Sequence, residues 1–90
     1  MENKKVHIEY LEEKLDAFLI LKNHTPRKTQ ASYDQMQSII NTVSGYVLCE
    51  NPELYSYADP NVDDSEFFSD KYFGNELGKL IDNLKAETIL

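Results

Sequence analysis

The stretch from Tyr33 to Val47 constrains the fold of this chain more than any other. Its apolar residues recur at steps of three and four, the spacing that places side chains on one face of a helix. These residues are Tyr33, Met36, Ile40, Val43 and Val47, and the face is widened by Ile39, Tyr46 and Leu48. Two heptads are too few for a free coiled coil, so the pattern predicts a core helix of a bundle. Gly45 weakens that helix by about 1 kcal/mol relative to Ala and is expected to admit a neighbouring helix closely.

A second apolar face predicts a first helix from Val6 to Lys22. Its members are Ile8, Leu11, Leu15, Phe18 and Leu19, spaced as on one side of a helix. The opening VHIEY also alternates as a short strand does. The second helix is expected to begin between Pro26 and Tyr33. Three residues could cap it: Thr25 with Pro26 in the first turn, Thr29, or Ser32 with Gln35 in a capping box.

The last third of the chain contains a short helix and a long one. Asn51 and Pro52 end the second helix and begin a short one whose body is Glu53 to Tyr57. After a turn at Asp59-Pro60-Asn61, Asp63 forms a capping box with Glu66 and opens a helix that runs through Phe73. Gly74 is predicted to be its C-terminal cap or a kink. A continuation beyond it places four apolar residues inward: Leu77, Leu80, Ile81 and Leu84.

These patterns define the expected fold class. Ninety residues make one domain, and 28 % charged with 41 % apolar residues is typical of a globular protein. We predict a single helical domain over residues 1–90. It is all-α, a small antiparallel bundle of three long helices plus one short helix before the last.

Charge and cysteine content exclude several classes of function. The net charge of −7 disfavours direct nucleic-acid binding, because phosphate recognition draws on clustered Lys and Arg. Cys49 is the only cysteine, so there is no internal disulfide and nothing indicates an oxidising compartment. The longest apolar run in the N-terminal region, Ala17 to Leu21, is far shorter than the roughly 20 residues that span a bilayer. We expect a cytoplasmic protein without membrane association.

Motifs of catalysis and cofactor binding are missing from the sequence. The glycines do not form a phosphate-binding loop, and His7 and His24 lack the spacing of zinc ligands. We therefore expect no enzyme activity and no cofactor.

Acidic and aromatic residues are concentrated between Glu50 and Glu76. This stretch holds eight acidic residues against one base, Lys71, so it carries as much net negative charge as the entire chain. It also holds six of the ten aromatic residues. Such a surface suits a basic protein partner, for instance a nuclease or another nucleic-acid-handling protein whose groove the acids occupy as a nucleic-acid mimic. The predicted partner-binding residues are Glu53, Tyr55, Tyr57, Asp59, Asp63, Asp64 and Glu66.

Two alternatives of other classes compete with this prediction. The first is a divalent-cation module, since oxygen-bearing side chains occupy positions 1, 3, 5, 7 and 12 of a calcium-type loop. These weak candidates are Asp59, Asn61, Asp63, Ser65 and Asp70. The loop has Asp64 where such loops carry an invariant glycine, and we expect no metal there. The second is a structural homo-oligomer built through the Tyr33 to Val47 face.

The order of elements and one short motif suggest a family. Glu53-Leu54-Tyr55-Ser56-Tyr57, after Asn51-Pro52 and before an acidic turn, resembles the tyrosine-bearing short helix of the immunity proteins that neutralise nuclease colicins and pyocins. The resemblance implies a stoichiometric inhibitor with Tyr55 and Tyr57 as aromatic anchors and acids that steer association. The tyrosines are separated by one residue here, whereas they are adjacent in that family. A small phage protein that blocks a host defence would bind its target through the same kind of acidic and aromatic surface.

Overall fold

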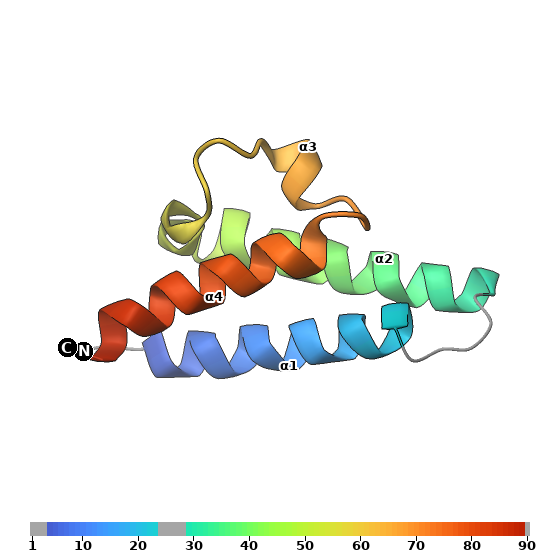
Figure 1. The fold of residues 1–90 in the computed structure, drawn as a ribbon, viewed down its shortest axis with the longest axis horizontal. Coiled ribbons are helices and arrows are strands. Elements are labelled where there is room, and N and C mark those ends of the chain that lie inside the picture. Colours follow the sequence, from blue (N-terminus) through green and yellow to red (C-terminus); the bar gives the residue numbers. More distant parts are fainter. Residues whose placement is uncertain (1–3, 24–28, 90) are drawn as a thin grey trace.

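The computed structural model describes residues 4–23 and 29–89 (Figure 1). These residues form helices and no strand, so the all-α prediction is confirmed for the described part of the chain. The long helices are α1 (Lys4–Asn23), α2 (Gln30–Gly45) and α4 (Phe73–Ile89). Three short elements lie between α2 and α4, where one was predicted: the π-helix η1 (Tyr46–Glu50), the 3-10 helix η2 (Pro52–Tyr57) and α3 (Asp64–Phe67).

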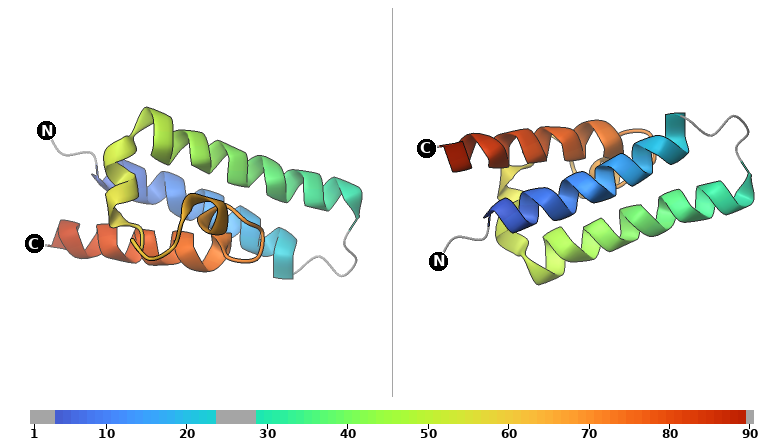
Figure 2. Two further views of the ribbon diagram at one scale, coloured as in Figure 1. Left: turned by 90° about the horizontal axis from the view of Figure 1, so that it is seen from above. Right: turned by 90° about the horizontal axis from the view of Figure 1, so that it is seen from below.

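Helix α1 lies against both other long helices. It runs antiparallel to α2 and to α4, which point in the same direction on its two sides (Figures 1 and 2). The predicted first helix is confirmed, and it begins two residues earlier than expected. The alternative prediction of a strand at Val6 to Tyr10 is wrong, because these residues belong to α1. The helical spacing of Ile8 and Leu11 buries both side chains against the other helices.

Helix α2 begins at one of the three predicted positions. The Thr29 hydroxyl accepts the N–H of Ser32 at 3.2 Å, and the Ser32 hydroxyl oxygen accepts the N–H of Thr29 at 2.9 Å. This is a reciprocal capping box in which Ser32 supplies the third helical residue. Ser32 is therefore the partner of the cap, so the predicted Ser32 and Gln35 pairing is wrong. The alternative cap at Thr25 and Pro26 lies outside the described residues, as does His24.

The core is built from the predicted apolar faces. Of the Tyr33 to Val47 face, Met36, Ile40, Val43 and Val47 are buried, while Tyr33 is 47 % exposed. The rings of Phe18 and Phe73 meet edge to face at 4.9 Å between centroids. The other buried apolar residues are Ile8, Leu11, Leu54, Phe67, Leu77, Leu80, Ile81 and Leu84. The predicted inward face of the last helix is therefore confirmed.

The close approach between helices occurs at a different glycine from the one predicted. A Cβ on Gly45 would meet nothing within 4 Å, whereas a Cβ on Gly74 would lie 3.1 Å from Cδ2 of Leu19. Gly74 is the second residue of α4 and is neither a C-terminal cap nor a kink. It packs against Leu19 and Phe18 of α1, so a larger residue would press on α1.

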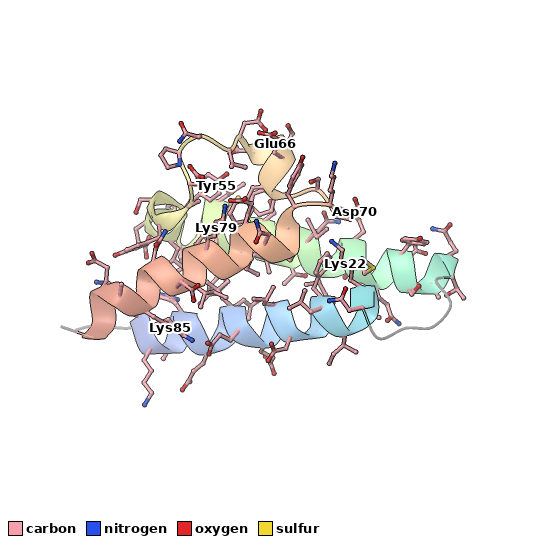
Figure 3. All side chains as sticks on the ribbon, in the orientation of Figure 1. Lys22, Tyr55, Glu66, Asp70, Lys79 and Lys85 are labelled. Atoms are coloured by element: carbon pink, nitrogen blue, oxygen red, sulfur yellow. The ribbon has the colours of Figure 1, made fainter. Side chains whose placement is uncertain are left out.

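The predicted helix from Asp63 through Phe73 is interrupted. Its start is confirmed, because the Asp63 carboxylate accepts the N–H of Glu66 at 2.9 Å and the Glu66 carboxylate accepts the N–H of Asp63. The helix ends after four residues, and α4 begins only at Phe73. Lys22 of α1 donates to the backbone carbonyls of Asp70 and Lys71 at 3.1 and 3.4 Å (Figure 3). A contact from α1 thus holds the chain between the two helices in an open turn.

The end of α2 widens into a π-helical turn. The N–H of Asn51 bonds to the carbonyl of Tyr46, five residues earlier, at 2.9 Å. Such a turn accommodates one more residue than an α-helical turn. It leads directly into η2, which begins with Pro52 as predicted, although the Asn51 side chain forms no cap.

Candidate functional site

Residues 52–67, comprising η2, a turn and α3, form a unit that we call the insert. It packs on α4 and lies on the side of the bundle away from α1 (Figure 1). Leu54 and Phe67 anchor its two ends in the core, with exposed fractions of 2 % and 0 %. All seven predicted partner-binding residues belong to the insert.

An open groove of about 670 Å³ runs through the insert. Four of the seven predicted residues line it, namely Tyr55, Asp59, Asp63 and Asp64. The remaining lining residues are Ser56, Ala58, Pro60, Val62 and Ser65. The groove therefore combines three carboxylates with a tyrosine and apolar surface.

Tyr55 links the two halves of the insert. Its ring meets that of Phe67 edge to face at 5.4 Å between centroids, and its hydroxyl donates to Oδ1 of Asp64 at 2.8 Å. Burial, followed by the hydrogen bond to Asp64, raises the pKa of Tyr55 to about 12. At neutral pH the hydroxyl is protonated and acts as a donor.

Each carboxylate of the groove has one oxygen committed to the fold. Oδ1 of Asp63 accepts the N–H of Glu66 and the hydroxyl of Ser65, and Oδ1 of Asp59 accepts the N–H of Asn61 at 2.9 Å. The backbone bond from Glu66 holds the pKa of Asp63 below its usual value. These bonds fix the orientation of the acids, and a carboxylate still has lone pairs for a further donor.

The other predicted residues lie beside the groove. Glu53 is exposed on η2, and Glu66 is exposed on α3, where it completes the capping box (Figure 3). Tyr57 is half-buried against the core, and its carbonyl accepts a hydrogen bond from Asn83 at 2.8 Å. Tyr57 therefore supports the insert on α4, whereas Tyr55 reaches the groove.

One acid of the stretch is not on the surface. Glu76 lies on α4 with an exposed fraction of 4 %, close enough to Tyr55 for its charge to help raise the pKa of that phenol. Its Oε2 is 3.4 Å from Nζ of Lys79, while its Oε1 has no hydrogen-bond partner in the described structure. The acidic surface is thus formed by fewer residues than the sequence count indicates.

The candidate calcium loop does not form a cage of ligands. Residues 64–67, positions 6 to 9 of the predicted loop, are helical, and Asp63 caps that helix. Within residues 4–23 and 29–89, no three acidic, His or Cys side chains are grouped as a metal site requires. The geometry gives no support to the cation-binding alternative.

Sequence reasoning missed a cluster at the π-helical turn. The Tyr46 hydroxyl lies 2.6 Å from Nδ1 of His7, and the Tyr46 ring stacks on Tyr10 at 4.1 Å between centroids. Burial is the main cause that raises the pKa of both tyrosines. His7 and Tyr46 are 39 residues apart, so no local pattern could have indicated the pair.

The described residues form an all-α fold with a groove lined by three carboxylates. Compared with known protein families, curated proteins and solved structures, the chain gives no significant match. None of the helices described has the length and apolar character needed to cross a bilayer.

Proposed function

We propose that this protein is a non-catalytic inhibitor or regulator whose insert binds a basic site on another protein. The groove carries this proposal, because it places the Tyr55 ring beside the carboxylates of Asp59, Asp63 and Asp64. An entering Lys or Arg would have its charge matched by the acids and its aliphatic part covered by apolar surface. Tyr55 is the type of residue that anchors protein interfaces.

Charge outside the groove supports the same partner. Glu53 and Glu66 are exposed on either side of it, and the chain as a whole carries −7. A field of one sign accelerates encounter with a basic surface and weakens as salt increases. We therefore propose that the partner is a nuclease or another nucleic-acid-handling protein, met in the cytoplasm.

Two biological settings fit this proposal. In one, the protein neutralises a toxin in the manner of the nuclease immunity proteins, whose tyrosine-bearing segment η2 resembles. In the other, it is a phage protein that occupies the nucleic-acid groove of a host defence enzyme. The binding physics is the same in both.

The test compares two charge reversals of equal size. The variant Glu53→Lys, Asp64→Lys changes the insert, and Glu9→Lys, Glu13→Lys changes two exposed acids of α1. Both variants carry the same net charge, so a general electrostatic effect would weaken partner binding equally in both. Asp63 is left unchanged because its carboxylate caps α3.

The proteins are immobilised to capture partners from a lysate of the source organism, and the captured protein is then purified and titrated by calorimetry. We expect the α1 variant to bind like the wild type. The insert variant should bind at least about tenfold more weakly, with the larger loss at low salt. Equal affinity of the two variants would exclude the insert as the interface. Urea unfolding of the insert variant beside Tyr55→Phe, which lacks the same hydrogen bond, measures how much of any stability loss comes from that bond.

A further inference from the structure

We infer that the face formed by α1 and α2 binds a second copy of this chain. A groove of about 480 Å³ lies between these helices, lined by Ala17, Ile20, Leu21, Gln35, Ser38 and Ile39. None of the six lining residues is charged. Ile20 is 57 % exposed in it, and with Ala17, Leu21 and Ile39 it makes most of the lining apolar.

The helix beside this groove is poor in charge. Together α2 (16 residues) and η1 (5 residues) carry only Asp34 and Glu50, in a chain with nine basic and 16 acidic residues. Apart from Asp34, the exposed positions of α2 are occupied by uncharged residues: Gln30, Ala31, Tyr33, Gln35, Gln37, Ser38, Asn41 and Thr42. Depletion of charge and the presence of an exposed tyrosine are features of protein interfaces.

Charge favours a second copy as the occupant of this face. Two chains of −7 repel each other, so they can associate only where each is least charged. The groove lining and the exposed side of α2, where Asp34 is the one acid, meet that condition, whereas the exposed acids Glu13 and Asp16 of α1 must lie at the edge of such a contact. In the view from below, α1 and α2 lie nearer the viewer than the acidic insert (Figure 2). A basic partner would gain nothing from an uncharged face and would bind at the insert.

The face is also complementary to itself. A twofold contact brings the same patch together from both sides, so each copy must supply both a projection and a recess. Ile20, which is 57 % exposed, would provide the projection, and the groove that it lines would provide the recess. Amide and hydroxyl side chains donate and accept hydrogen bonds, so two identical polar rims can pair.

The groove lies between two helices that run along the longest axis of the molecule, which measures 42 × 23 × 20 Å (Figure 2). A stable complex buries about 800 Å² on each partner. A contact confined to the groove and the exposed side of α2 is smaller than a whole side of the molecule, so we expect a reversible dimer.

The test measures the sedimentation of the full chain over a concentration series that reaches high micromolar. We expect a reversible dimer whose dissociation constant falls as salt is added, because salt screens the repulsion between two acidic chains. Ile20→Glu places a charge in the contact and should raise the dissociation constant by about tenfold or more. Val6→Glu is the matched control: Val6 is equally exposed, at 59 %, lies on the same helix outside the groove, and should leave the dimer unchanged.

Two results would overturn the inference. One is a wild type that remains monomeric at every concentration and salt level, which would leave the groove to a different protein. The other is a dimer that Ile20→Glu and Val6→Glu weaken equally. Circular dichroism verifies that both variants fold, and because both sites are exposed we expect native helix content. The insert variant Glu53→Lys, Asp64→Lys should still dimerise, so failure of the proposed function is distinguishable from failure of this inference.

Discussion

The hydroxyl of Tyr55 donates a hydrogen bond of 2.8 Å to Oδ1 of Asp64, nine residues further along the chain. This bond joins η2 to the first turn of α3 across the turn that separates them. It orients one wall of the acidic groove, and it can be removed by deleting a single oxygen atom.

Tyr55→Phe should lower the free energy of unfolding by about 0.5–1.5 kcal/mol, the usual net value of one hydrogen bond. The loss is expected near the lower end, because Asp64 is exposed and can bond to water instead. Urea unfolding measures it. Tyr72→Phe serves as the control, since the Tyr72 hydroxyl has no hydrogen-bond partner among the described residues; an equal effect of both substitutions would contradict the assignment.

Alkaline pH should weaken the fold through the same tyrosine. The pKa of Tyr55 is about 12 in the folded protein and 10.0 is the ordinary value, so folding favours the protonated phenol. Its contribution to stability is complete below pH 10 and is lost as the pH rises toward 12. Urea unfolding along a pH series should therefore show a smaller alkaline loss for Tyr55→Phe than for the wild type.

Asp64→Asn should lower the pKa of Tyr55 without returning it to the ordinary value. Burial is the larger cause of the raised pKa, and the hydrogen bond to Asp64 comes second. Absorbance of the phenolate during an alkaline titration follows the change. A titration curve identical to that of the wild type would mean that Asp64 does not act on Tyr55 in solution.

Acid should weaken the start of α3. The pKa of Asp63 lies below 3.8, mainly because the N–H of Glu66 bonds to its charged form. The stabilisation is present above the ordinary carboxyl pKa and disappears as the pH falls through the lowered one. Asp63→Asn, which keeps a capping oxygen, should lose less stability at neutral pH than Asp63→Ala. Asp70→Ala provides the comparison for urea unfolding, because Asp70 is exposed and its side chain caps no helix among the described residues.

Glycine substitutions should differ according to what a methyl group meets. Gly45→Ala has free space and Gly78→Ala has an ordinary contact at 4.0 Å with Leu15, so each should stabilise the protein by about 0.5–1 kcal/mol. Gly74→Ala must displace Leu19, and we expect it to cancel that gain or reverse it. Thermal unfolding ranks the three variants. An equal gain at Gly74 would show that α1 and α4 are packed less closely than described.

Features that depend on neighbouring residues were predictable from the sequence. The long helices follow from apolar spacing, and the capping box of Asp63 and Glu66 follows from two residues three positions apart. The Thr29 cap was one of three predicted choices, which the sequence alone could not separate.

Features that depend on distant residues were not predictable. The interruption before α4 involves Lys22, 48 residues away from the carbonyl of Asp70 that it contacts. Which glycine meets a neighbouring helix depends on how α1 and α4 pack. For the same reason, the sequence could not indicate that Glu76 is buried or that Tyr57 faces the core while Tyr55 lines the groove. The role of these residues in binding stays a prediction.

The π-helical turn at Tyr46–Glu50 affects where the acidic insert lies relative to α2. Each residue of an α-helix advances the chain by about 100° around the axis, and a π turn holds one residue more. Leu54 and Phe67 anchor the insert in the core, so the turn before it must have the length that lets both anchors be reached from the end of α2. A chain with one residue fewer in this turn would strain the junction between α2 and η2 or lose part of that anchoring. The position of the acidic insert therefore depends on a turn that lies outside the insert.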